Sequence, residues 1–177
     1  LKQPSAKLLP SPQQLQQKKQ EISSNYITTS ASMAEQKKEE VVGPVVITQK
    51  YGEEGGDAFQ WSQGDAAAQA VTGWTIRSAK YIDQISFRIG GVQSAKHGGN
   101  GGDEESVDLQ NGECVVGIAV RSAKFVDSLT FLTSHNRSFH YGGKGGDLFF
   151  CSGARLLDFQ GRSAKFVDQL QFKFATK

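Results

Sequence analysis

A seven-residue segment occurs three times in this chain, as RSAKYID at 77–83 and as RSAKFVD at 121–127 and 162–168. A glycine-rich loop also occurs three times, as YGEEGGD at 51–57, HGGNGGD at 97–103 and YGGKGGD at 141–147. From Asp83 to Gly98 is 15 residues, and from Asp127 to Gly142 is again 15. Two motifs that alternate in fixed register indicate three copies of one structural unit, which pack together to bury their apolar faces.

The residues that flank each heptapeptide alternate between apolar and polar. This pattern occurs at Ile85, Phe87 and Ile89, at Leu129, Phe131 and Thr133, at Leu170, Phe172 and Phe174, and, before the first two aspartates, at Trp74, Ile76, Val116, Ile118 and Val120. A period of two over short runs, with glycine-rich breaks between them, predicts half-buried β-strands. We therefore expect an all-β fold in which three sheets of roughly four strands share one core with pseudo-threefold symmetry.

Composition changes near residue 41. Residues 1–40 contain no glycine and no phenylalanine, whereas the rest of the chain contains all 20 glycines and all 11 phenylalanines. We interpret 1–40 as an N-terminal extension that cannot form a core of its own, and 41–177 as the globular domain. The extension is either a disordered tail or a docking arm for a neighbouring chain, or the biological chain starts at Met33.

Several classes of function do not fit the sequence. The net charge is only +2, so nucleic-acid binding is not expected. No run of about eighteen apolar residues occurs, so membrane insertion is not expected. The three histidines, His97, His135 and His140, do not belong to a recognisable catalytic or metal-binding motif. We therefore predict a protein that is not an enzyme.

The two cysteines do not decide whether the protein is secreted or cytoplasmic. Cys114 and Cys151 are either one disulfide of a secreted protein or two small buried side chains. Asn136 lies in an Asn-Arg-Ser glycosylation pattern, which matters only in a secreted chain. An extracellular location is favoured, and a cytoplasmic one follows if Met33 is the true start.

The heptapeptide has the chemistry of a neutral sugar site. Its aspartate is an acceptor that can take two hydroxyl donors at once. The backbone N–H groups of Lys80 and Tyr81, and of their equivalents, can donate to a ring oxygen and a hydroxyl. The glycines nearby allow a ligand to approach the backbone closely. No metal or cofactor is required, although Asp57, Asp103 and Asp147 after the loops leave a divalent ion as an alternative. Such sites are shallow and bind weakly, so a high overall affinity would require several of them to bind the same glycan at once.

The alternation of GG-x-GG loops with a short motif that ends in Asp resembles the jacalin-related lectins, which have the β-prism I fold, over roughly residues 45–175. The likeness is greatest to the griffithsin-like, three-site, mannose-binding members. The resemblance implies that Asp83 faces the loop 98–102, that Asp127 faces 142–146, and that Asp168 faces 52–56, because the first strands complete the last sheet. The sugar-binding residues it predicts are Asp83, Lys80, Tyr81, Gly98, Gly99, Gly102, Asp127, Lys124, Phe125, Gly142, Gly143, Gly146, Asp168, Lys165, Phe166, Gly55 and Gly56.

This sequence departs from the family motif at two places. The motif begins with glycine, and this chain has Ala79, Ala123 and Ala164 there, each followed by a lysine. If the backbone needs a positive φ at that position, alanine is strained. The first loop also carries Glu53 and Glu54. Three alternatives follow: a working mannose lectin, a lectin tuned to acidic glycans by its lysines, or a structural protein that assembles through its N-terminal extension.

Overall fold

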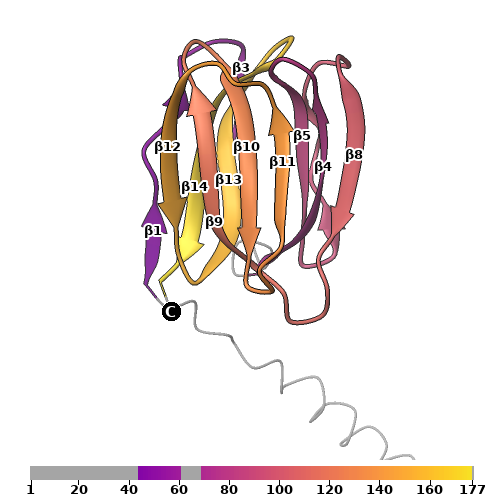
Figure 1. The fold of residues 1–177 in the computed structure, drawn as a ribbon, viewed down its shortest axis with the longest axis vertical. Coiled ribbons are helices and arrows are strands. Elements are labelled where there is room, and N and C mark those ends of the chain that lie inside the picture. Colours follow the sequence, from indigo (N-terminus) through magenta and orange to yellow (C-terminus); the bar gives the residue numbers. More distant parts are fainter. Residues whose placement is uncertain (1–43, 61–68, 177) are drawn as a thin grey trace, which may run out of the picture. The chain divides into compact units, whose positions relative to one another are not determined.

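The computed structural model describes residues 44–60 and 69–176, and every helix or strand within these ranges is a β-strand. The strands form three antiparallel sheets (Figure 1). The predicted all-β class with three sheets is therefore confirmed. The proposed extension over residues 1–40 lies outside the described residues.

The first sheet carries the heptapeptide 77–83 in the turn between its two long strands. Its strand order is β6-β5-β4-β8, and β7 also pairs with β5. The strands are β4 (Val71–Ser78), β5 (Ile82–Ile89), β6 (Val92–Gln93), β7 (His97–Gly98) and β8 (Asp103–Asp108).

The second sheet repeats this plan around the heptapeptide 121–127. Its strand order is β11-β10-β9-β12. The strands are β9 (Val115–Ser122), β10 (Val126–Thr133), β11 (Ser138–Gly142) and β12 (Asp147–Ser152).

The third sheet is assembled from both ends of the domain. Its order is β1-β14-β13-β3, and β2 also pairs with β14. The strands are β1 (Val45–Ile47), β2 (Tyr51–Gly52), β3 (Asp57–Phe59), β13 (Arg155–Ser163) and β14 (Val167–Ala175). Gly52 lies opposite Gln169 and Val45 lies opposite Ala175. The pairing of the first strands with the last sheet, which the resemblance implied, is therefore observed.

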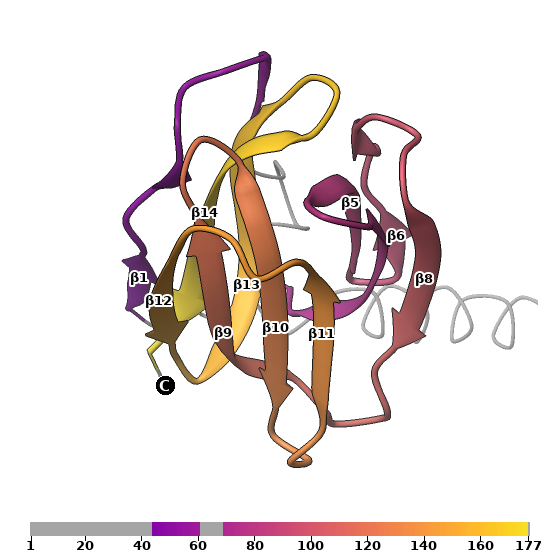
Figure 2. The same ribbon diagram turned by 45° about the horizontal axis from the view of Figure 1, so that its top comes forward.

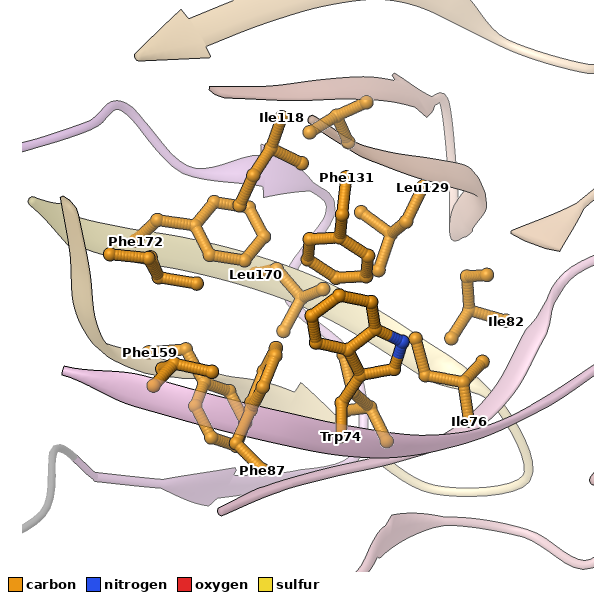
Figure 3. Close-up of a cluster of buried hydrophobic side chains, with 14 of the residues drawn as sticks. Trp74, Ile76, Ile82, Phe87, Ile118, Leu129, Phe131, Phe159, Leu170 and Phe172 are labelled. Atoms are coloured by element: carbon orange, nitrogen blue, oxygen red, sulfur yellow. The ribbon is translucent and has the colours of Figure 1, made fainter. Parts of the chain in front are cut away.

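One core fills the space between the three sheets. The alternating residues predicted from the sequence supply it with one exception, and Trp74, Phe87, Phe131 and Phe172 are fully buried. The prediction was wrong at Val116, which is only partly buried; Val115 lies in the core instead, because the pairing register of β9 with β10 shifts there. Figure 3 shows these rings with Leu170 between them and Ile118 at the edge of the same cluster. Trp74 of the first sheet donates a hydrogen bond from Nε1 to the hydroxyl of Tyr141 of the second sheet at 2.9 Å. The core thus contains at least one polar link between sheets.

The two cysteines are free. The Cys114 thiol donates to the carbonyl of Ala154, and the Cys151 thiol donates to the carbonyl of Ile118, each at 3.6 Å. Of the two alternatives left open by the sequence, the structure shows the pair of partly buried thiols.

Candidate functional site

The three heptapeptides form the turns that join β4 to β5, β9 to β10 and β13 to β14. Figure 2, which brings the top of Figure 1 forward, shows the last two of these turns at the same end of the domain. In each turn the alanine N–H donates to the carbonyl of the aromatic residue two positions later, at 3.2 Å from Ala79 to Tyr81 and at 3.1 and 3.0 Å in the other two repeats. The same local geometry is therefore built three times.

Alanine is not strained at the position where the family motif has glycine. Among the described residues other than glycine, only Asn136 has a positive φ. Ala79, Ala123 and Ala164 therefore have negative φ angles, and the cost that a left-handed backbone would impose does not arise. Strain at these positions is no argument against a working site.

Each heptapeptide aspartate is almost fully buried under a glycine loop. Asp83 and Asp127 are 5% exposed and Asp168 is 6% exposed. In the first sheet the N–H of Gly99 donates to the carbonyl of Asp83 at 2.9 Å, and a methyl group at Gly101 would overlap Oδ1 of the same residue. Gly98 and Gly102 at the two ends of the loop have φ angles of +118° and +62°. The loop needs glycine at these positions because its backbone turns tightly and lies directly on the carboxylate.

The structure brings together the pairs that the resemblance implied. Loop 98–102 lies on Asp83, loop 142–146 on Asp127 and loop 52–56 on Asp168. The third loop differs at the position equivalent to Gly99, where Glu53 instead donates its N–H to the Lys124 carbonyl at 3.4 Å. The exposed side chain of Glu54 pairs with Lys50 at 3.7 Å.

The arginine of each heptapeptide fastens the glycine loop of the same site, which the sequence did not reveal. Arg77 donates from Nε to the carbonyl of Gly101 at 3.0 Å and from Nη2 to that of Gly102 at 2.7 Å. Arg162 repeats this arrangement on Gly55 and Gly56 at 2.9 and 2.8 Å. Arg121 holds the remaining loop with one bond to Gly146 at 3.1 Å. The available signal was that arginine occupies the first position of all three heptapeptides.

The residue after the aspartate also contacts the loop in two of the three sites. Gln84 donates from Nε2 to the carbonyl of Gly99 at 3.0 Å. Gln169 donates in the same way to Gly52 at 3.3 Å. The second site has Ser128 at this position. The loop on Asp127 is therefore held by fewer side-chain hydrogen bonds than the other two.

The carboxylates are electrostatically unusual. Burial raises the pKa of Asp83, Asp127 and Asp168 above the ordinary aspartate value, against the opposing effect of the alanine N–H and nearby cations. Oδ2 of Asp83 and Oδ2 of Asp168 are buried and have no hydrogen-bond partner among the described residues. A buried acceptor without a donor is costly. A ligand that supplies hydroxyl donors would remove this cost.

The same turns also contain backbone N–H groups without a backbone acceptor. Across the described part of the chain, no backbone carbonyl accepts from the N–H of Lys80 or Tyr81, and the same holds for their equivalents in the other two turns. Each turn thus offers a buried acceptor and two unpaired backbone donors. This combination suits vicinal hydroxyls.

The three predicted aromatic residues meet one another. Tyr81, Phe125 and Phe166 form a triangle whose ring centroids are 5.1 to 5.4 Å apart. Each ring also has the lysine of its own heptapeptide above it, with Nζ 5.2 to 5.5 Å from the centroid. The three turns therefore share a partly exposed aromatic centre, which we call the aromatic triangle.

Two of the histidines in the described part of the chain have partners of their own. His97 stacks on Phe59 with centroids 3.9 Å apart, and burial lowers its pKa. His140 hydrogen-bonds Thr130 at 2.8 Å. No group of three or more His, Cys, Asp or Glu side chains in 44–60 and 69–176 could hold a metal ion. Within the same ranges no helix is long and apolar enough to cross a membrane.

Three sheets around one core, with a carboxylate, a glycine loop and backbone donors at each of three turns, define a β-prism I domain with the features of a carbohydrate-binding protein. The chain matches the family model described as "Jacalin-like lectin domain" over residues 48–173. It therefore belongs to the jacalin-like lectin family.

Solved structures agree with this assignment. The mannose-binding jacalin-related lectin AcmJRL from Ananas comosus is 27% identical, with a TM-score of 0.64 over 73% of this chain and 96% of its own. A prostate-specific WGA16 glycoprotein lectin is 25% identical, with a TM-score of 0.60 over 72% of this chain and 96% of its own. Malaysian banana lectin, at 20% identity and a TM-score of 0.62 over 73% and 97%, supports the fold alone. The comparison with curated protein sequences finds no match.

Proposed function

We propose that this chain is a lectin that binds mannose-type glycans through three metal-independent sites, in the manner of the griffithsin-like members of the family. The observation that carries the proposal is the repeated set of a buried aspartate, a glycine loop on top of it, and two unpaired backbone N–H groups. The mannose-binding relative from Ananas comosus supports the choice of sugar. The residues proposed to contact sugar are those predicted from the sequence, within a domain that spans 41–177.

The three sites suit a branched glycan better than a single sugar. Each site is a small surface with few direct contacts, so its own affinity should be low. Because the three turns meet at the aromatic triangle, the sites lie on one end of the domain and can engage several branches at once. Simultaneous binding can raise the overall affinity by a factor of roughly 10² to 10⁴.

The protein is expected to be retained on mannose-agarose at pH 7 and to be released by free mannose or by a wash at about pH 4. The raised pKa means that each carboxyl is protonated at milder acidity than an ordinary aspartate, whose pKa is roughly 3.9. Protonation converts a carboxylate with two acceptor oxygens into a carboxylic acid that carries one O–H donor, so the hydrogen bonds from sugar hydroxyls become weaker. The control is the column flow-through at pH 7 with free mannose present.

Failure to bind the column, together with a blank glycan array at pH 7, would contradict the proposal. Binding to charged glycans only would keep the lectin function and would favour acidic glycans over plain mannose. An extracellular location is proposed together with this function, since branched glycans are displayed outside the cell.

Assembly is a second candidate function, and exposed apolar side chains on two edge strands favour it. Leu148 and Phe150 on β12 are 61% and 62% exposed, and Val45, Val46 and Ile47 on β1 are also exposed. Edge strands of this kind can pair with another chain. We propose that the N-terminal extension supports such self-association.

Deletion of residues 1–40 is then expected to lower the mass of the particle by at least half, measured by light scattering. The full-length chain at the same concentration is the control. An unchanged mass would contradict assembly through the extension.

A further inference from the structure

Each glycine loop contacts a heptapeptide other than its own. Gly99, in the loop on Asp83, lies so close to the backbone carbonyl of Lys165 that a methyl group at Gly99 would come within 2.5 Å of that oxygen. Gly143, in the loop on Asp127, has the same relation to the carbonyl of Lys80. In the loop on Asp168, the N–H of Glu53 donates to the carbonyl of Lys124.

These contacts run around the domain in one direction. Lys80 of the first repeat borders the second site, Lys124 of the second borders the third, and Lys165 of the third borders the first. The electrostatic interactions between lysines and aspartates follow the same order around the domain. The lysine that favours the charged form of Asp83 is Lys165, that of Asp127 is Lys80, and that of Asp168 is Lys124. The aromatic triangle explains how this happens, because it brings the three turns within reach of one another.

The rims of the three sites differ in charge. The variable position of the glycine loop is Asn100 at the Asp83 site and Lys144 at the Asp127 site, while the loop at the Asp168 site carries Glu53 and Glu54. These four side chains are exposed. The aspartate that follows each loop is present in all three repeats and does not distinguish them.

We propose that each sugar site takes its specificity-determining lysine from the neighbouring repeat, and that the Asp127 site, with Lys80 and Lys144 at its rim, is the one that selects anionic sugars. This inference rests on the proposed lectin function. The Asp83 site, with Lys165 and Asn100, has one lysine at its rim in addition to the arginine that all three sites share. The Asp168 site has Glu53 and Glu54 beside Lys124 and Lys50, so its rim is less positive than that of the Asp127 site. A carboxylate, sulfate or phosphate group on the sugar would be held by lysine as a point charge.

The test uses a chain in which only the Asp127 site remains, made by the substitutions Asp83→Asn and Asp168→Asn. Mannose and mannose 6-phosphate are titrated into this protein by calorimetry at pH 7, and the ratio of their affinities is the readout. Adding Lys80→Ala is expected to lower the preference for the phosphorylated sugar roughly three- to tenfold. Adding Lys124→Ala instead tests the competing assignment, because Lys124 has the same motif position but lies in the same repeat as Asp127; it is expected to change the ratio less than Lys80→Ala does. Adding Lys165→Ala is the matched control with no expected effect on the ratio, because Lys165 borders the Asp83 site and belongs to the repeat of Asp168, and both of these sites have been removed.

The outcomes separate the two proposals. A larger loss with Lys124→Ala, or equal losses with both, would overturn the cross-repeat assignment while leaving the lectin function intact. Binding by the wild type but not by the single-site protein would also overturn the inference, because the Asp127 site would then not work alone. If neither the wild type nor the single-site protein binds any sugar, the lectin function fails. Thermal unfolding of each variant checks that the fold is retained.

Discussion

Replacement of Asp83, Asp127 and Asp168 together by asparagine is expected to abolish sugar binding and to raise the stability of the domain at pH 7. The three carboxyl groups are buried, and burial raises their pKa in the folded state. A raised folded pKa means that the stability contributed by each group is fully present below the unfolded pKa and is lost as the pH rises through the folded pKa. Folding at neutral pH therefore includes the cost of burying three charges, which asparagine avoids.

The measurement is thermal unfolding at pH 7 and at pH 3, together with retention on mannose-agarose. The melting temperature of the triple variant should be higher than that of the wild type at pH 7, by roughly 2–4 °C for each kcal/mol gained. The gain should disappear at pH 3, where the wild-type carboxyls are protonated. The matched control is the triple replacement of Asp57, Asp103 and Asp147 by asparagine, which changes the net charge equally at exposed positions. A triple variant that unfolds earlier than the wild type at pH 7 would contradict the argument.

Replacement of Trp74 by alanine is expected to lower the free energy of unfolding by about 3–5 kcal/mol. Trp74 is fully buried, its ring centroid lies 4.5 Å from that of Phe131, and its Nε1 donates to Tyr141. The substitution would leave a large cavity among the rings that surround Trp74 (Figure 3). It would also remove the hydrogen bond to Tyr141. A domain is commonly stable by only about 5–15 kcal/mol, so this loss is a large fraction of the total.

The measurement is urea unfolding followed by far-ultraviolet circular dichroism, which reports on the backbone and not on the tryptophan that has been removed. Tyr141→Phe is the partial control, because it removes only the hydroxyl and leaves Nε1 of Trp74 without an acceptor. It is expected to cost about 1–3 kcal/mol. If Trp74→Ala costs no more than Tyr141→Phe, the ring packing contributes less than its burial implies.

The sequence predicted the sheets because apolar alternation and motif register are local signals. Ile85, Phe87 and Ile89 lie in the core as their spacing indicated. The pairing of Val45 with Ala175 could not be read from spacing and came only from the family resemblance, since no local signal links residues so far apart.

The candidate site was predicted in part. The juxtaposition of Asp83 with its loop was implied by the resemblance, and the concern over Ala79 was settled by its ordinary backbone angle. The role of Arg77 was missed because its partners are backbone carbonyls, which no side-chain pattern reveals. The position of Lys80 beside the neighbouring repeat's loop depends on how three turns meet, which is a property of the packed fold.

The way the third sheet closes also determines where other parts of a longer polypeptide can be attached. β14 runs from the turn at Val167, next to Asp168, to Ala175, and Val45 at the start of β1 lies opposite Ala175. The first and last strands of the domain therefore have their free ends side by side, away from the heptapeptide turns. A protein fused at either end would therefore begin at the end of the domain opposite the heptapeptide turns. A fusion partner attached there would leave the proposed sugar sites uncovered.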